Sequence, residues 1–160
     1  AKAPAIGHRR INARSETAAT KPAFRKSLRE RRCLILADGF YEWKREGSRK
    51  QPYYIKLQNG DPFAFAGLWD RWQPADGQPL ETCTIPTTTP NELVAPIHDR
   101  MPVILPSNAY PLWLNPTVHN VDPIQALLIP YPAHEMIAYP VSTRVNSPVY
   151  DAPECIAPIP

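Results

Sequence analysis

The stretch from Ala37 to Lys44 reads Ala-Asp-Gly-Phe-Tyr-Glu-Trp-Lys and directly follows the apolar run Cys33–Leu36. That run has the composition of a buried strand. The Asp-Gly pair predicts a bend, after which the chain continues as a second extended segment, Phe40–Lys44. Because side chains alternate along a strand, Glu42 lies on one face and its two neighbours, Tyr41 and Trp43, lie on the other.

Glu42 is the residue of this stretch that suggests acid-base catalysis. Its aromatic surroundings remove part of the hydration of the carboxylate, which raises its pKa towards the range useful for proton transfer near neutral pH. The alternative is a surface strand in which Glu42 pairs with Lys44, because perturbed carboxylates also occur in structural ion pairs.

The composition indicates an α+β fold in one domain. The 160 residues are enough for one hydrophobic core, and 21 prolines favour short elements and turns over long helices. We expect a mostly antiparallel mixed sheet, or an open β-barrel, with short peripheral helices. The expected strands are 32–36, 40–44, 52–57, 63–69, 81–85 and 134–141, and the expected helices are 20–31, 106–114 and 122–128. Asn59-Gly60 predicts a hairpin turn between strands 52–57 and 63–69.

The cysteines and histidines predict neither a structural metal nor a cofactor. The three cysteines are far apart and the four histidines are scattered, so no set of zinc ligands is formed. Phosphate-loop, dinucleotide-binding and nucleophile-elbow motifs are missing. An odd number of cysteines indicates a reduced, intracellular protein, and no apolar stretch has the roughly 18 residues of a membrane span.

Charge is distributed unevenly along the chain. The first fifty residues contain 14 Lys and Arg against five Asp and Glu, a net charge of +9, and the remaining residues have a net charge of −6. A concentration of Lys and Arg is typical of a surface that binds nucleic acid phosphates. For Arg25–Arg32 alone, a solvated helix face explains the charge equally well.

Two further polar clusters are candidates for a site. Residues 98–100 are His, Asp and Arg, which combine a titratable base, an orienting carboxylate and a binder of anions. The alternative is a turn held by a bond between His98 and Asp99. Asn12–Thr17 has an equally dense mixture of donors and acceptors, although Ser15 or Thr17 could simply cap a helix.

Three segments together resemble a known family: Ile11–Thr17, Cys33–Lys44 and Ile97–Val103. They are similar to the signature blocks of the SRAP family, the SOS-response-associated peptidases or abasic-site processing proteins. Further matches occur at Phe65–Trp69, Thr84–Thr87, Val145-Asn146 and Pro153–Ile156. The similarity extends over nearly the whole chain.

The resemblance implies that the protein captures abasic sites in single-stranded DNA in the response to DNA damage. In that family the sugar aldehyde condenses with the amine and thiol of an N-terminal cysteine to form a thiazolidine crosslink. By motif, the catalytic residues would be Asn12, Glu42 and His98. The DNA-binding residues would be Arg14, Trp43, Thr87 and Arg100, with arginines on phosphates and Trp43 against a base. The arginines would lower the pKa of Glu42 while burial raises it, so the sign of its shift is left open.

The start of the chain departs from the family pattern. Family members begin Met-Cys-Gly-Arg, whereas this chain begins Ala1-Lys2-Ala3 and has its first cysteine at Cys33. We therefore expect residues 1–160 to be a single SRAP-like domain truncated at its N-terminus, with crosslinking, lyase and self-processing activity confined to the full-length form. The alternatives are a non-catalytic single-stranded DNA-binding module and an autoproteolytic cysteine peptidase. We also expect a monomer in the cytoplasm, associated with the bacterial nucleoid.

Overall fold

The computed structural model describes residues 11–159, so the expectation about the first residues, Ala1–Ala3, lies outside the described part. The chain folds into two compact units. The first unit contains residues 11–36, 64–88 and 102–130, and the second contains residues 37–63, 89–101 and 131–159.

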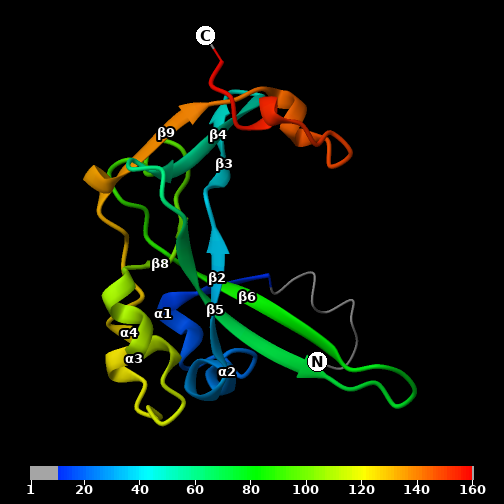
Figure 1. Cartoon of the computed structure of the whole chain (residues 1–160), viewed down its shortest axis with the longest axis vertical. Helices are drawn as coiled ribbons and strands as arrows, with labels where there is room; N and C mark the ends of the chain where they lie inside the picture. Colours follow the sequence, from blue (N-terminus) through cyan, green and yellow to red (C-terminus); the bar gives the residue numbers. More distant parts are fainter. Residues whose placement is uncertain (1–10, 160) are drawn as a thin grey trace. The chain divides into compact units, whose positions relative to one another are not determined.

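The first unit is built on a six-stranded mixed sheet with the strand order β1-β6-β5-β2 (Figure 1). Short strand β7 pairs with β6, and β8 pairs with β5. β1 and β6 are parallel, whereas β5 is antiparallel to both β6 and β8. The strands are β1 (Asn12–Arg14), β2 (Arg32–Ala37), β5 (Phe63–Trp72), β6 (Leu80–Thr88), β7 (Met101–Pro102) and β8 (Ile104–Leu105).

Short helices accompany this sheet. They are α1 (Ser15–Ala18), α2 (Arg25–Glu30), the 3-10 helix η2 (Ser107–Ala109), α3 (Tyr110–Leu114) and α4 (Asp122–Gln125). Their apolar residues join those of the strands in one core, whose largest fully buried side chain is Trp113. No helix among residues 11–159 is long and apolar enough to cross a membrane.

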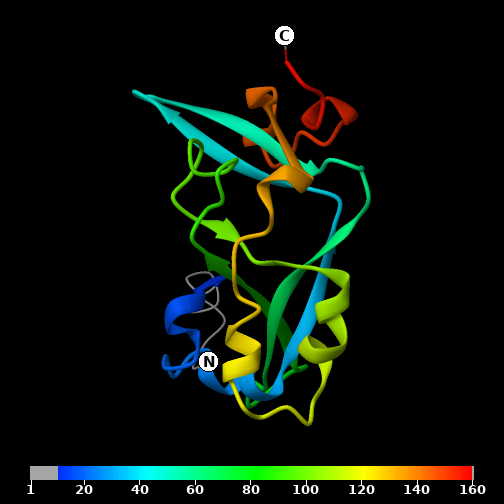
Figure 2. The same ribbon diagram turned by 90° about the vertical axis from the view of Figure 1, so that its left-hand side faces the viewer.

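The second unit is built on a three-stranded antiparallel sheet with the order β3-β4-β9. Its strands are β3 (Phe40–Glu46), β4 (Arg49–Leu57) and β9 (Met136–Pro140), and its 3-10 helices are η3 (Ala133–Glu135), η4 (Thr143–Asn146) and η5 (Pro153–Cys155). Figure 2 shows β3 and β4 as a long cyan ribbon that narrows towards its tip. The apolar residues buried in this unit include Ile55, Val94, Met101 and Val141.

The predicted α+β class with a mostly antiparallel mixed sheet and short helices is confirmed. The prediction of a single domain stays a prediction. The helix expected over residues 20–31 is shorter, Arg25–Glu30. The backbone N–H groups of Thr20 and Lys21 both bond to the carbonyl oxygen of Thr17. These bonds complete the end of α1, so the chain turns before α2 begins.

The hairpin predicted between residues 52–57 and 63–69 is wrong. The turn itself forms, with Gly60 at φ 79° and Asn59 Oδ1 accepting the N–H of Asp61 at 3.0 Å. However, β4 pairs with β3 on one side and β9 on the other, so neither edge of β4 is open to β5. Strand β5 therefore joins the six-stranded sheet of the first unit.

From a buried position in β2, Arg32 bonds to two other backbone segments of the first unit. Its guanidinium donates to the carbonyl oxygens of Leu28 and Arg29 at the end of α2, both at 2.7 Å. It also donates to the carbonyl oxygens of Trp113, in the last turn of α3, and of Asn115, which follows α3, both at 2.6 Å. Burial lowers the pKa of Arg32, but these acceptors satisfy the charge where the helices leave their own carbonyls unpaired.

We expect Arg32→Met to destabilise the protein by about 3 kcal/mol, because it keeps much of the apolar stem but leaves buried carbonyl groups without a donor. Arg29→Met is the matched control, since Arg29 is exposed in the preceding helix α2, and it should change stability by less than about 0.5 kcal/mol. Urea unfolding of both variants gives the comparison. Equal stability of the two variants would contradict the role assigned to Arg32.

Candidate functional site

The bend at Asp38-Gly39 is fixed by Tyr54 on the neighbouring strand. A Cβ on Gly39 would come within 2.2 Å of Tyr54 Cζ, so the ring occupies the space that any other residue would need. Tyr54 donates its hydroxyl to Asp38 Oδ1 at 3.4 Å. Burial, assisted by Asp38, raises the pKa of Tyr54 to about 12, so the hydroxyl stays protonated. This contact determines where β3 begins and therefore where Glu42 lies.

Glu42 lies in the middle of β3, opposite Tyr53 of β4. Its Oε2 atom is 4.0 Å from Nε2 of His98, and the two side chains are 21% and 40% exposed. Burial raises the pKa of the Glu42 carboxyl, although the charge of His98 and a hydrogen bond from the backbone of Trp43 act in the opposite direction. Burial is the largest of these effects, which resolves the sign that the sequence left open. The neutral, protonated form of Glu42 is therefore easier to reach than that of an exposed glutamate.

His98 is positioned by a turn that Asn91 organises. Asn91 Oδ1 accepts the N–H of Val94 at 3.0 Å, and the carbonyl oxygen of Val94 accepts the N–H of His98 at 2.9 Å. Asn91 Nδ2 donates to the carbonyl oxygen of Tyr131 at 2.7 Å, which attaches the turn to a distant part of the chain. Asn91 thus caps this turn, and His98 is held at its backbone.

The imidazole of His98 has a partner on its other nitrogen. The backbone N–H of Arg100 lies 3.0 Å from Nδ1, and Asp99 Oδ1 lies 3.3 Å from it. In the neutral tautomer in which Nδ1 accepts from Arg100, the ring proton is on Nε2 and faces Glu42. In the charged form, Nδ1 carries a proton that Asp99 can accept.

Trp43 extends from the opposite face of β3 and is held in place there. Its Nε1 donates to Asn146 Oδ1 at 2.7 Å, and its ring centroid is 6.3 Å from that of Tyr41. Tyr41 also donates its hydroxyl to the carbonyl oxygen of Cys155 at 3.2 Å, so the C-terminal segment lies against this face. Asn146 is a positioning residue that the sequence interpretation did not identify as one, although Val145-Asn146 was among the segments that match the family.

The remaining predicted residues fall into two groups. In the first unit, Asn12 and Arg14 are exposed on either side of buried Ala13. Arg14 pairs with Thr87 in the parallel register of β1 and β6, so the structure brings these three residues together on one face of that strand pair. In the second unit, Arg100 follows His98 by two residues and is partly buried.

The capping role considered for Ser15 or Thr17 is wrong. The residue that precedes α1 is Arg14, and no side chain caps the helix. Ser15 is buried as the first residue of the helix. The polar cluster at Asn12–Thr17 therefore divides into an exposed pair on β1 and a helix start that the backbone forms without a side-chain cap.

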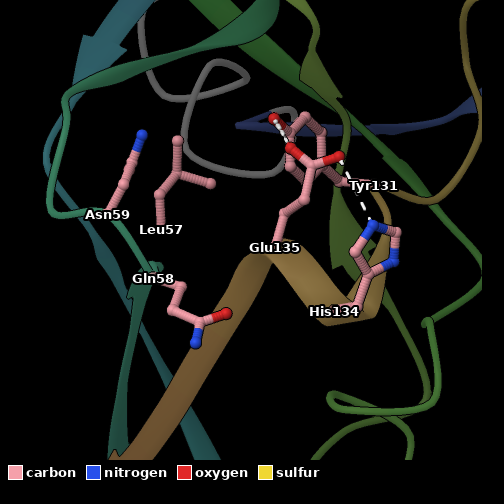
Figure 3. Close-up of a pocket in the computed structure, with 6 residues that line it drawn as sticks. All are labelled: Leu57, Gln58, Asn59, Tyr131, His134 and Glu135. Carbon is pink, nitrogen blue, oxygen red and sulfur yellow. Dashed lines mark hydrogen bonds and ion pairs between the residues drawn. The ribbon is translucent and has the colours of Figure 1, made fainter.

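A separate pocket in the second unit has a volume of about 320 Å³ (Figure 3). It is lined by Leu57, Gln58, Asn59, Tyr131, His134 and Glu135. Glu135 accepts from the Tyr131 hydroxyl at 3.0 Å and lies 3.8 Å from His134, as the dashed lines show. None of the predicted site residues lines this pocket.

Cys33 of the first unit offers little as a nucleophile. Cys33 lies in β2, and burial, followed by the neighbouring Cys83, raises the pKa of its thiol. Only the thiolate attacks, so a raised pKa reduces the reactive fraction. Among residues 11–159, no group of three or more His, Cys, Asp and Glu side chains could hold a metal ion.

Comparison with known proteins identifies the family. A family model described as SOS response associated peptidase (SRAP) matches residues 1–148. The abasic site processing protein YoqW of Bacillus subtilis (strain 168) is 54% identical over 157 residues, covering 98% of this chain and 70% of that protein. The abasic site processing protein HMCES of Gallus gallus is 38% identical over 169 residues, covering 92% of this chain and 50% of that protein.

A solved structure supports the same conclusion. The crystal structure of a protein from Bacteroides thetaiotaomicron superimposes with a TM-score of 0.91 at 32% identity, covering 99% of this chain and 72% of that one. The close approach of Glu42 and His98 and the fold around it thus accompany matches in both sequence and structure. The chain belongs to the SRAP family.

We expect Glu42→Gln to raise the melting temperature at pH 8. Folding raises the pKa of the Glu42 carboxyl. Such a group makes its full contribution to the stability of the folded protein below its unfolded pKa of about 4.3. This contribution is lost as the pH rises through the folded pKa. The difference between variant and wild type should therefore vanish below about pH 4. Glu46→Gln, an exposed change on the same strand, is the control and should produce no such gain. A variant less stable than wild type at pH 8 would contradict the desolvation of Glu42.

The bond between Trp43 and Asn146 predicts an energetic coupling between the two side chains. We expect Asn146→Leu, which preserves shape but removes the acceptor, to lose about 0.5–1 kcal/mol of stability. In the Trp43→Phe background the same change should cost almost nothing, because the donor is already gone. A double-mutant cycle measured by chemical unfolding tests this coupling, and additive losses would show that Asn146 does not hold the indole.

Proposed function

We propose that the protein captures abasic sites in single-stranded DNA as part of the response to DNA damage, with Glu42 and His98 as its acid-base pair. The observation that carries the proposal is the 4.0 Å approach of His98 Nε2 to a carboxyl whose pKa is raised by burial. Further support comes from relatives named abasic site processing proteins. Such an activity belongs in the bacterial cytoplasm, at the nucleoid.

The proposed reaction needs repeated proton transfers at one carbon. An abasic sugar opens to an aldehyde when its ring oxygen gains a proton and its C1 hydroxyl loses one. In the full-length protein the amine of an N-terminal cysteine adds to that aldehyde, and a water molecule leaves to form an imine. The cysteine sulfur then bonds to the same carbon, its proton passes to the nitrogen, and a thiazolidine results. One aldehyde, one amine and one thiol thus give one thiazolidine and one water.

Glu42 and His98 are assigned to these transfers because of their chemistry. A protonated Glu42 donates to the ring oxygen and later to the departing hydroxyl, which a carboxyl with a raised pKa does more readily at neutral pH. His98 returns the proton through Nε2, the nitrogen that faces Glu42. Asn12 is assigned to the sugar, and Arg14, Thr87 and Arg100 are assigned to the flanking backbone phosphates. Trp43 is assigned to a base beside the lesion.

The test is a crosslinking assay with full-length protein and a single-stranded oligonucleotide that contains one abasic site. We expect a shifted band that survives heating on a denaturing gel, and no such band with an undamaged oligonucleotide. Glu42→Gln should slow its formation by about 10²- to 10⁴-fold, the usual contribution of a general acid or base. Glu46→Gln is the matched control and should react at the wild-type rate.

Two outcomes would overturn parts of this proposal. Absence of a covalent band, with binding retained on a native gel, would favour a non-catalytic single-stranded DNA-binding module. An unchanged rate and pH profile in Glu42→Gln would remove the assigned role of Glu42 while leaving capture itself intact.

A further inference from the structure

The tip of the β3–β4 hairpin concentrates positive charge at the end of a two-stranded ribbon. Gly47 and Ser48 form its turn, with Gly47 at φ 63°, which suits the tight turns of hairpins. Of the seven residues 44–50, four are basic and one is acidic. Every residue from Arg45 to Lys50 is exposed, and Figure 2 shows the tip projecting away from β9 and the C-terminal segment.

The two faces of this tip differ in how their charges are balanced. On one face, Lys44 Nζ lies 3.6 Å from Glu46 Oε1, and Glu46 is directly opposite Arg49. On the other face, Arg45 is directly opposite Lys50. Neither forms an ion pair with any residue of the part of the chain that the structure describes. Like charges in this arrangement destabilise a strand pair, so the second face has a repulsion that an anion would relieve.

The unbalanced face is continuous with Trp43. Strand alternation places Arg45 two residues beyond Trp43 on the same side of β3, about 7 Å along the strand. Lys50 stands in the same relation to Pro52, the residue opposite Trp43. An indole followed by two cations is the combination by which proteins hold a single nucleic acid strand, with aromatic rings on bases and cations along the backbone.

We propose that Arg45 and Lys50 bind the phosphodiester backbone of a single nucleic acid strand as it passes Trp43. The guanidinium of Arg45 suits two phosphate oxygens at once, and the ammonium of Lys50 supplies a second positive charge. This site rests on the proposed function and extends it, because it adds two phosphate contacts to those assigned to Arg14, Thr87 and Arg100. An acidic protein segment matches the charge but not the adjoining indole, so nucleic acid is the better fit.

The experiment compares two double variants of the full-length protein. Arg45→Gln with Lys50→Gln removes the proposed contacts. Lys44→Gln with Arg49→Gln removes the same charge from the same tip, but from the face that Glu46 balances. The affinity for a fluorescent, undamaged single-stranded oligonucleotide is measured by anisotropy at several salt concentrations. Thermal melting of each variant verifies that it folds.

We expect the first double variant to lower the slope of log affinity against log salt concentration by about 1.4, since each phosphate contact on a single strand contributes about 0.7. Its affinity at low salt should fall roughly tenfold, a fold-change of the order expected when two charged phosphate contacts are lost. The Lys44 and Arg49 variant should keep the wild-type slope, and each single variant of Arg45 or Lys50 should lose about half of the effect.

Equal losses in the two double variants would overturn the proposal, because they would show an effect of net charge alone. An unchanged slope in the Arg45 and Lys50 variant would also overturn it, and would leave an acidic protein segment as the occupant of this face. Failure here is distinct from failure of the proposed function. Crosslinking of abasic DNA at saturating concentration does not depend on these two contacts, so the wild-type covalent band tests the function separately.

Discussion

The ring of Tyr54 lies directly on Gly39, where even a methyl group would overlap it. This contact sets the point at which the chain leaves the bend and enters β3, and the register of β3 with β4 follows from it. The position of Glu42 depends on that register, because a slip of one residue would move every side chain of β3 to the opposite face. The carboxyl would then lie against the C-terminal segment instead of His98.

Because side chains alternate along β3, residues with different roles lie on its two opposite faces. Glu42 meets His98 on one face, where burial maintains a carboxyl that accepts a proton readily. Tyr41 and Trp43 occupy the other face, where their polar atoms bond to Cys155 and Asn146 of the C-terminal segment. Desolvation of Glu42 disfavours its charged form, so the proposed acid-base function opposes stability at neutral pH. The ordered aromatic face and the Asn91 turn hold the pair in place despite this cost.

Much of this arrangement could be predicted from the sequence because it depends on local signals. The Asp38-Gly39 bend, the strand after it and the grouping of His98 with Arg100 are all visible in short segments. The reason why residue 39 must be glycine could not be predicted, because it depends on which residue of β4 lies against the bend. The Asn59-Gly60 turn shows the same limit: the turn was predicted, but the pairing of β4 with β9 is a contact between distant segments. Asn146 was missed as a positioning residue because it follows the Trp43 that it binds by about one hundred residues.

The most direct measurement of the central claim is the titration of Glu42 by carbon NMR in the free protein, with its carboxyl signal assigned by its loss in Glu42→Gln. Burial of Glu42 predicts a pKa above the ordinary value for glutamate. We also expect a further rise in His98→Gln, because the positive charge of His98 lowers the pKa of Glu42. A pKa at or below the ordinary value, or a fall when His98 is replaced, would show that Glu42 and His98 do not form the proposed acid-base pair.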